Sequence, residues 1–264
     1  MTKKGLDGPN DRHLTGVMVL HGFTANLDSV RELFAPLIRT GLDLATPLLR
    51  GHGLSSPDHL REVTWQDWFD DAEEAMAASA GSSGKLVVIG HSMGALLALQ
   101  LAARHPDLID SVILATPPIR LTSLLGPSRP LHFLAPLISM FIDRWEIESR
   151  FADPACAIVP EHYEWAPTMT IMSMFDLVQA TLPVMSRVRV PVLIIQSRHE
   201  SVVLPESAEI ILQAIATSPE EKSVVWLERS DHQVFCDCER DLAVRAVTEF
   251  VAGRIASSKI LSRP

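Results

Sequence analysis

Cysteine is scarce in this chain. Its 264 residues include three, Cys156, Cys236 and Cys238, which are too few for the disulfide framework of a small secreted protein. The one-residue spacing of Cys236 and Cys238 suits neither a CxxC redox pair nor a zinc knuckle. With His232 added, the ligands are still too few and too close for a tetrahedral metal site. We therefore predict free structural thiols, no bound metal, and a reducing compartment, the cytoplasm.

Positive charge is also scarce. The chain has 23 Lys and Arg residues against 32 Asp and Glu, which gives a formal net charge of −9. Nucleic-acid binding depends on clustered Lys and Arg that neutralise phosphates, and docking on anionic lipid has the same requirement. The composition therefore argues against both kinds of partner.

Long apolar runs are absent as well. None approaches the roughly 18 residues that cross a bilayer, so we predict no integral membrane segment. The first residues, MTKKGLDGPNDRH, lack the apolar stretch of a signal peptide. Hydrophobic residues make up 47% of the chain and charged residues 21%, which is enough apolar material to fill the core of one large domain.

What the sequence does contain is an alternation of short apolar segments with longer segments of helical periodicity. Six segments are apolar on both faces, as the buried strands of a parallel sheet are; they are 16–20, 42–47, 85–90, 111–116, 191–197 and 223–229. Helical patterns lie at 30–41, 64–80, 93–105, 205–216 and 239–253. The alternation predicts an α/β fold with about six mainly parallel strands and helices on both faces.

One connection is much longer than a crossover requires. Residues 117–190 separate the fourth predicted strand from the fifth, where about a dozen residues would suffice. The segment is rich in Pro, Leu, Met, Phe and Trp, so we predict an inserted helical cap over the carboxyl ends of the strands. The predicted division is an α/β core at 14–116 and 187–256, a cap (lid) at 117–186, and flexible termini at 1–13 and 257–264.

The strongest chemical signal is GHSMG at residues 90–94. It lies directly between a predicted strand, KLVVI, and a predicted helix, ALLALQLAA. A sharp strand-to-helix turn of this kind holds the serine hydroxyl above the sheet, and the two glycines avoid collisions with the neighbouring backbone. We therefore predict Ser92 as a nucleophile.

A serine hydroxyl needs a base to take its proton, and His232 is the best-placed histidine. It stands in ERSDHQVF, after the last predicted strand and before the last helix. That position puts it at the carboxyl edge of the sheet, beside Ser92. Most of the other histidines lie in helices, in the cap or in early loops, where surface or packing roles are expected.

The turn LHGFTAN follows the first predicted strand. Its backbone N–H groups can point at the space above Ser92, so we predict an oxyanion hole made by the amides of Phe23 and Met93. His21 and Gly22 belong to the same turn and are predicted to contact substrate.

These motifs resemble the α/β-hydrolase fold family, and most closely its small bacterial carboxylesterases and monoacylglycerol lipases. The pieces VLHGFTAN, RGHG, GHSMG, VPVLIIQSRH and SDHQVFCDCERD are similar to stretches typical of that group, and the resemblance runs from about residue 15 to nearly the end. It implies Ser92 as nucleophile, His232 as base and the Phe23 and Met93 amides as oxyanion hole. It also implies an ester substrate with a lipid-like acyl group and no cofactor. Too few residues precede Val17 for the first two strands of larger members.

The third member of a Ser–His–acid triad is predicted to be Glu200, in SRHESVV after the fifth strand. Its place agrees with the order serine, acid, histidine of this fold. Relatives usually have Asp there, and Glu can serve with one more methylene. The alternatives are Asp231, which adjoins the base, Glu206, in the helix opened by a proline, and Asp176, in the cap.

The cap offers many adaptable apolar side chains. They are Ile119, Leu124, Leu125, Phe133, Leu137, Met140, Phe141, Met169, Ile171, Met172, Met174 and Phe175. We expect most of them to pack the cap onto the sheet and a minority to line an acyl pocket. Ile119, Met140 and Met172 are predicted as substrate-binding residues, together with His21 and Gly22.

The sequence thus predicts a serine hydrolase that cleaves carboxylic esters, with medium or long acyl chains or as monoacylglycerols, through an acyl-enzyme. One alternative keeps the triad but acts on a thioester, a carbon–carbon bond or a peracid. Another is a non-catalytic protein that binds small molecules in the same pocket. The only partner predicted is the ester or lipid substrate, and a homodimer is left open.

Overall fold

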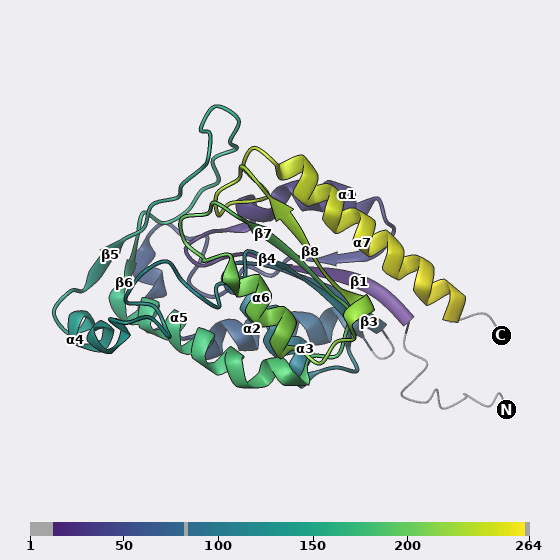
Figure 1. The fold of residues 1–264 in the computed structure, drawn as a ribbon, viewed down its shortest axis with the longest axis horizontal. Helices are drawn as coiled ribbons and strands as arrows, with labels where there is room; N and C mark the ends of the chain where they lie inside the picture. Colours follow the sequence, from purple (N-terminus) through teal and green to yellow (C-terminus); the bar gives the residue numbers. More distant parts are fainter. Residues whose placement is uncertain (1–12, 82–83, 262–264) are drawn as a thin grey trace.

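The computed structural model describes residues 13–81 and 84–261. Its centre is a six-stranded sheet in which every neighbouring pair of strands is parallel (Figure 1). The strand order is β2-β1-β3-β4-β7-β8. The bounds are β1 His13–Leu20, β2 Asp43–Ala45, β3 Gly84–His91, β4 Ile109–Ala115, β7 Val192–Ser197 and β8 Lys222–Leu227. The prediction of six mainly parallel strands is confirmed.

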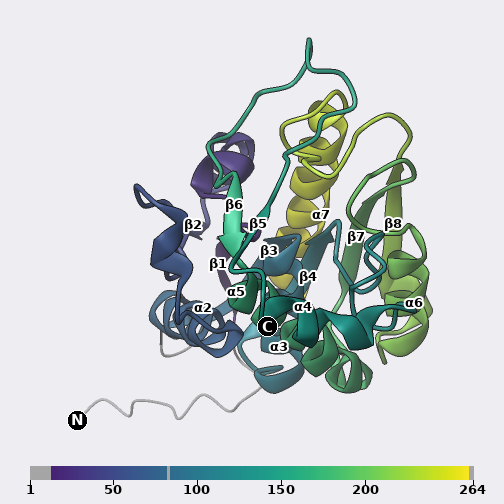
Figure 2. The same cartoon turned by 90° about the vertical axis from the view of Figure 1, so that its left-hand side faces the viewer.

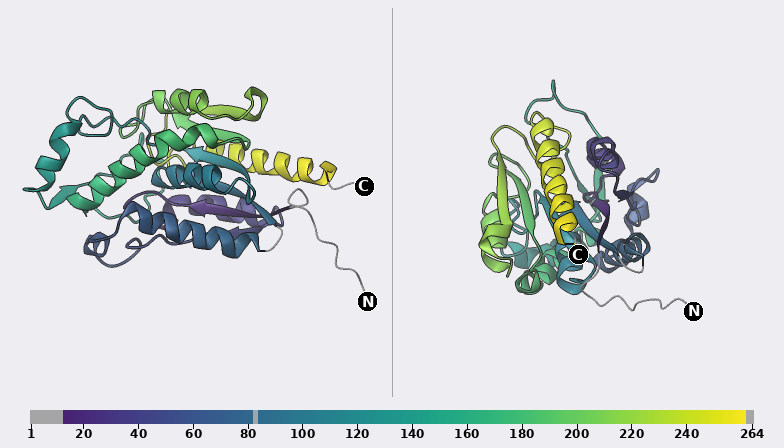
Figure 3. Two further views of the ribbon diagram at one scale, coloured as in Figure 1. Left: turned by 90° about the horizontal axis from the view of Figure 1, so that it is seen from below. Right: turned by 90° about the vertical axis from the view of Figure 1, so that its right-hand side faces the viewer.

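Helices cover both faces of this sheet, as predicted. Buried side chains of α2 (Trp65–Ala80), α3 (Met93–Arg104) and α6 (Glu206–Ala214) form one apolar cluster with the strands. Those of α1 (Phe34–Ile38) and α7 (Arg240–Leu261) form a second cluster on the opposite face. Both views of Figure 3 show α7 running along the sheet. Because the inner strands β1, β3, β4 and β7 meet a helix layer on either side, most of their residues are apolar on both faces.

The helices begin where local chemistry favours it. Thr64 precedes α2 and forms a capping box with Asp67, in which the Thr64 N–H donates to the Asp67 carboxylate at 2.9 Å. The segment predicted as one helix at 30–41 is instead a 3₁₀ turn, η1 (Leu27–Leu33), followed by the short α1.

The last helix is longer than predicted. α7 continues through Gly253 to Leu261, although an interior glycine costs about 1 kcal/mol relative to alanine. Arg254, just past the glycine, pairs with Asp110 of β4 at 2.8 Å, which holds this part of the helix on the sheet. The flexible end predicted at 257–264 is therefore helical to residue 261. Residues 1–12 and 262–264 lie outside the described residues.

The long segment between β4 and β7 contains helices and one small sheet. Its elements are η3 (His132–Leu134), α4 (Ala135–Ser139), β5 (Arg144–Glu146), β6 (Trp165–Pro167), α5 (Thr168–Thr181) and η4 (Leu182–Arg187). The antiparallel pair β5–β6 was not predicted. In Figure 1, α4, β5 and β6 lie at the end of the molecule away from the last turn of α7. Figure 2 views that end and shows β6, α5 and α4 in front of the central strands.

The prediction of three free thiols is wrong. Cys156, in the β4–β7 segment, forms a disulfide with Cys238, in the loop before α7, across a Cα–Cα distance of 5.4 Å. Sequence spacing could not reveal this pair, because it joins residues 82 positions apart. Cys236 is free, and burial raises the pKa of its thiol to about 12. Asp153 lies near the bonded sulfurs, but metal ligation requires thiolates, which a disulfide does not offer.

Removing this disulfide is expected to lower the free energy of unfolding. By the entropy of closing a loop of this length, the double variant Cys156→Ala/Cys238→Ala should lose about 4–5 kcal/mol. Urea denaturation of the variant and the oxidised parent measures the difference. A thiol titration of the unfolded, unreduced parent should find one reactive thiol; three would contradict the pairing.

None of the helices within residues 13–81 and 84–261 combines the length and the hydropathy needed to cross a bilayer.

Candidate active site

Ser92 occupies the sharp turn between β3 and α3. Residues 90–94, which make this turn, form the serine elbow. The Ser92 backbone has φ 52° and ψ −117°, a left-handed region that non-glycine residues adopt only at some cost. A Cβ on Gly90 would lie 2.1 Å from the Gly94 carbonyl oxygen, and one on Gly94 would lie 2.3 Å from that of Leu20. Both positions of the GxSxG motif therefore require glycine, for the steric reason predicted.

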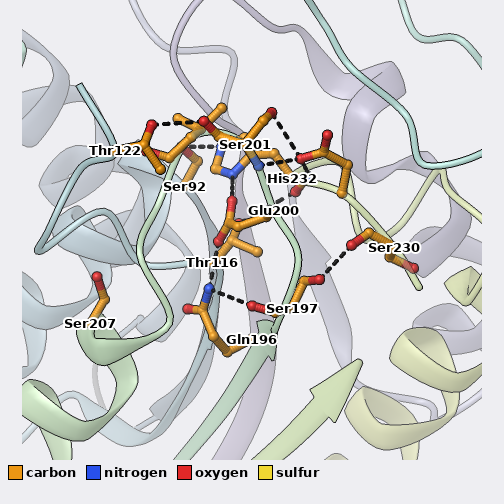
Figure 4. Close-up of polar contacts among 12 residues, drawn as sticks. Ser92, Thr116, Thr122, Gln196, Ser197, Glu200, Ser201, Ser207, Ser230 and His232 are labelled. Atoms are coloured by element: carbon orange, nitrogen blue, oxygen red, sulfur yellow. Dashed lines mark hydrogen bonds and ion pairs between the residues drawn. The ribbon is translucent and has the colours of Figure 1, made fainter. Parts of the chain in front are cut away.

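The Ser92 side chain is part of a continuous relay (Figure 4). Its Oγ lies 2.9 Å from Nε2 of His232, and Nδ1 of the same ring lies 2.5 Å from Oε2 of Glu200. A carboxylate can only accept, so Nδ1 carries the proton and Nε2 is free to accept the serine hydroxyl proton. All three residues are buried, each with 8% of its surface exposed. The structure brings together the three residues predicted as nucleophile, base and acid.

Within the described residues, the rival carboxylates form no hydrogen bond with the imidazole of His232. Asp231 turns its Oδ1 toward backbone and hydroxyl donors: the Ser201 N–H at 2.7 Å, the Ser201 hydroxyl at 3.0 Å and the His232 N–H at 2.7 Å. Glu206 is the first residue of α6, and Asp176 lies within α5. Among the four candidates, Glu200 alone hydrogen-bonds to the ring of His232 within the described chain.

A second histidine, His91, hydrogen-bonds to the backbone of His232. His91 Nε2 lies 3.0 Å from the backbone carbonyl oxygen of His232, and since a carbonyl only accepts, this nitrogen is the donor. Burial, reinforced by the nearby His232, lowers the pKa of His91 to about 3. His91 therefore stays neutral at neutral pH and adds no charge that would oppose protonation of His232.

The HGF turn lies directly against the serine. A Cβ built on Gly22 would be 3.3 Å from Cβ of Ser92, so the turn and the elbow are in contact. The N–H groups of Phe23 and Met93 donate to no acceptor in the described residues. Unpaired amides on both sides of a nucleophile are the arrangement that an oxyanion hole needs.

His21 does not line the apolar cavity that opens at Ser92 and His232. The prediction that it binds substrate is therefore corrected. Its Nδ1 donates to the Gly22 carbonyl oxygen at 2.8 Å, and its Nε2 accepts from the Leu49 N–H at 3.1 Å. His52 packs edge-on against it, with ring centroids 4.9 Å apart. His21 thus joins the HGF turn to the loop after β2. Burial lowers the pKa of His21 to about 4 and that of His52 to about 3.

These buried histidines should make the fold sensitive to acid. Below pH 6.5 the unfolded chain protonates His21, His52 and His91, whereas the folded chain keeps them neutral until about pH 3–4. The free energy of unfolding should therefore fall as the pH falls through this window, by about 2 kcal/mol per histidine at pH 5. Urea denaturation at pH 7 and pH 5 measures the change. His52→Asn should weaken the pH dependence, while the same change at exposed His59 should not; equal slopes for both would contradict this origin.

An apolar cavity of about 310 Å³ opens at Ser92 and His232. Its walls come from the HGF turn, the elbow and the β4–β7 segment; they include Gly22, Leu121, Leu125, Ala135, Ile138, Trp145, Ile147, Ile171, Met172, Met174 and Phe175. Gly22 and Met172, which were predicted to bind substrate, are among the residues that line it. Ile119 does not; it is buried in the core cluster that also contains α2, α3 and α6. Met140 does not either, because it is 76% exposed beyond α4.

Sequence reasoning missed the contacts that hold the two site loops together. Ser201 follows the acid and donates its N–H and its hydroxyl to Asp231, which precedes the base. These two hydrogen bonds link the loops after β7 and β8 in addition to the one between Glu200 and His232. Asp237 accepts from the N–H of Asp231 at 2.7 Å and from that of Ala152 at 2.9 Å. Gln196 also donates to Glu200, at 2.5 Å. For this contact the sequence offered one signal, a glutamine that follows four apolar residues in the strand.

The parallel sheet, the serine elbow after β3 and the histidine after β8 define an α/β-hydrolase. Residues 12–239 match the family described as Serine aminopeptidase, S33, and the chain belongs to this family. The predicted resemblance to the α/β-hydrolase family is confirmed.

Named relatives cover almost the whole chain. It is 30% identical over 241 residues to a thermostable monoacylglycerol lipase of Bacillus sp. (strain H-257), covering 90% of each chain. It is 26% identical over 238 residues to a carboxylesterase of Bacillus subtilis (strain 168), covering 89% of this chain and 91% of the relative. A solved structure from work on LipS and LipT, two metagenome-derived lipolytic enzymes, superposes with a TM-score of 0.82 at 28% identity, covering 92% and 95% of the two chains.

Proposed function

We propose that this protein is a serine hydrolase that cleaves carboxylic esters through an acyl-enzyme intermediate. The observation that carries the proposal is the relay from Ser92 through His232 to Glu200, which opens on an apolar cavity. In it, Ser92 is the nucleophile, His232 the general base and Glu200 the acid that orients the base. The lipase and carboxylesterase relatives support the same chemistry.

The first half-reaction forms the acyl-enzyme. The Ser92 oxygen attacks the ester carbonyl carbon while its proton passes to Nε2 of His232. The amides of Phe23 and Met93 hold the oxyanion of the tetrahedral intermediate. The bond to the alcohol oxygen then breaks, and the alcohol leaves with the proton from His232.

The second half-reaction uses water. His232, again neutral, takes a proton from a water molecule, which attacks the acyl carbonyl, and the same two amides stabilise the oxyanion. Collapse returns the proton to Ser92 and releases the carboxylic acid. Throughout, Glu200 keeps Nδ1 protonated and stabilises the imidazolium that forms twice in each turnover.

The substrate class follows from the cavity wall. Most of the apolar residues that line the cavity belong to the β4–β7 segment, so we propose that residues 117–186 act as a cap that binds the acyl chain. A wall of Leu, Ile, Met and Phe side chains favours medium or long acyl groups, including monoacylglycerols, because their burial releases apolar surface from water.

A hydrolysis screen tests this assignment. Chromogenic esters of rising acyl length and medium- and long-chain monoacylglycerols should all be cleaved, with kcat/KM rising from short to medium chains. The matched thioesters and an amide of the same acyl group belong in the same screen. The absence of ester hydrolysis at every acyl length would contradict the proposal. Faster turnover of the thioester than of the ester would identify the protein as a thioester hydrolase instead.

Location and assembly stay predictions. The argument for the cytoplasm from free thiols no longer holds, because Cys156 and Cys238 are joined and disulfides are typical of oxidising compartments. Fractionation of the source cells, with trapping of free thiols at lysis, would give both the compartment and the redox state. Light scattering of the purified chain would distinguish a monomer from a homodimer.

A further inference from the structure

Gln196 is a buried amide at the end of β7. It has no exposed surface, and its Nε2 donates to Oε1 of Glu200 at 2.5 Å, as Figure 4 shows. The residues of β7 before it are Val, Leu, Ile and Ile, so an apolar side chain would be the ordinary choice at this position. The amide therefore calls for an explanation.

The carboxylate of Glu200 depends on this amide. Its side chain is fully buried, and in the described residues it accepts one hydrogen bond on each oxygen. Oε2 accepts from Nδ1 of His232, and Oε1 accepts from Gln196. No backbone N–H within the described chain donates to it. Within the described residues, Gln196 is thus the only hydrogen-bond donor to the acid besides the base.

The orientation of the amide is determined, and it carries a cost. Oε1 of Gln196 is buried and has no hydrogen-bond partner in the described part of the chain, an arrangement unfavourable for stability. Turning the amide over would direct this oxygen at the carboxylate of Glu200 and replace an attraction by a repulsion. A methionine of similar length would avoid the unpaired oxygen, so stability alone does not account for glutamine here.

We propose that Gln196 is a positioning residue for ester hydrolysis, which holds the Glu200 carboxylate in the orientation that receives the Nδ1 proton of His232. The inference rests on the proposed function, in which Glu200 orients the base. A glutamate has one more rotatable bond than the aspartate usual at this place, so its carboxylate has more orientations to lose. The amide removes that freedom.

The first test compares two buried glutamines. Gln100 in α3 is also fully buried, donates to Thr181 Oγ1 at 3.2 Å and has an unpaired Oε1. Gln196→Met should lower kcat for a chromogenic ester roughly 10- to 100-fold with KM changed less than about twofold, as expected when an outer partner of a functional side chain is lost. Gln100→Met should leave both constants within about twofold. Equal constants for the two variants, at equal folded fraction, would overturn the inference.

The pH profile supplies a readout that a packing role would not move. Without the amide, the carboxylate is no longer held against Nδ1 and stabilises the imidazolium less, so the acid limb of kcat/KM should move to lower pH by about half a unit or more in Gln196→Met. The other titratable groups near the pair are His91, behind the base, and Asp231, bonded to Ser201. Neither is altered by the substitution. An unmoved acid limb would count against the proposal.

Gln196→Glu keeps the length and can donate only while protonated. Two adjacent buried carboxyls share a proton and lose it as the pH rises, so this variant should be active at low pH and lose kcat/KM with rising pH where the parent has a plateau. It also serves if Gln196→Met does not fold. A profile parallel to that of the parent would contradict the proposed contact.

A double variant separates this inference from the proposed function. In a Glu200→Gln background the carboxylate that Gln196 orients is gone, so adding Gln196→Met should change kcat by less than about threefold. If Glu200→Gln alone keeps full activity, the acid assignment fails and the inference with it. If Glu200→Gln is inactive while Gln196→Met resembles Gln100→Met, the proposed function stands and only the inference is wrong.

Discussion

Replacing Ser92 with alanine is expected to abolish ester hydrolysis, with kcat falling by roughly 10⁵-fold or more. The Ser92 hydroxyl is the proposed nucleophile, 2.9 Å from Nε2 of His232. Without it, no acyl-enzyme can form on residue 92. A chromogenic acyl ester measures the loss, and far-ultraviolet circular dichroism with a urea melt verifies that the variant is folded. We expect the variant to fold, because it removes a single oxygen atom from residue 92.

A phosphonate probe provides the matching chemical evidence. It should label the parent at Ser92 in a 1:1 ratio, seen by mass spectrometry, and should not label Ser92→Ala. Ser207, a buried serine at the start of α6, is a suitable control, because Ser207→Ala should label like the parent. Undiminished turnover by Ser92→Ala would disprove the proposed mechanism, and labelling at another residue would relocate the nucleophile.

Replacing Glu200 with glutamine is expected to lower kcat by about 10⁴-fold. The amide keeps the shape of the side chain, but it can present an N–H where the carboxylate accepted a proton from Nδ1 of His232. The imidazole then loses the tautomer that leaves Nε2 free for Ser92, and the imidazolium loses its counter-charge. KM should change little, because Glu200 is not among the residues that line the cavity.

Asp231→Asn is the matched control for this prediction. Asp231 adjoins the base and was an alternative acid, yet its carboxylate bonds to Ser201 and to the backbone rather than to the ring. Its loss should weaken the link between the two loops and reduce kcat by less than about tenfold. A larger loss in Asp231→Asn than in Glu200→Gln would reverse the assignment of the acid.

The two predictions differ in how much they depend on the tertiary structure. Ser92 could be selected from GHSMG alone, because the strand, turn and helix around it are contiguous in the chain. Glu200 could be placed only by position after the fifth strand, and a carboxylate one residue before His232 remained an alternative. The structure distinguishes the two carboxylates by their partners. Glu200 hydrogen-bonds to the imidazole of His232, whereas Asp231 accepts from the backbone N–H of the same residue.

The sequence by itself determined the features that depend on neighbours in the chain. These include the six strands, the main helices, the elbow with its two glycines, and the order serine, acid, histidine. Each comes from a local cause: apolar periodicity, a capping residue, or a steric demand at one φ and ψ. The departures, such as the continuation of α7 past Gly253, arose where a distant contact outweighed a local preference.

Only the tertiary structure decided the features that join residues far apart in sequence. The pairing of Cys156 with Cys238, the exclusion of Ile119 and Met140 from the cavity, and the hydrogen bond between Glu200 and His232 belong to this group. Composition and spacing constrain none of these distances. They are set by how the β4–β7 segment and the two loops after β7 and β8 pack at the carboxyl edge of the sheet.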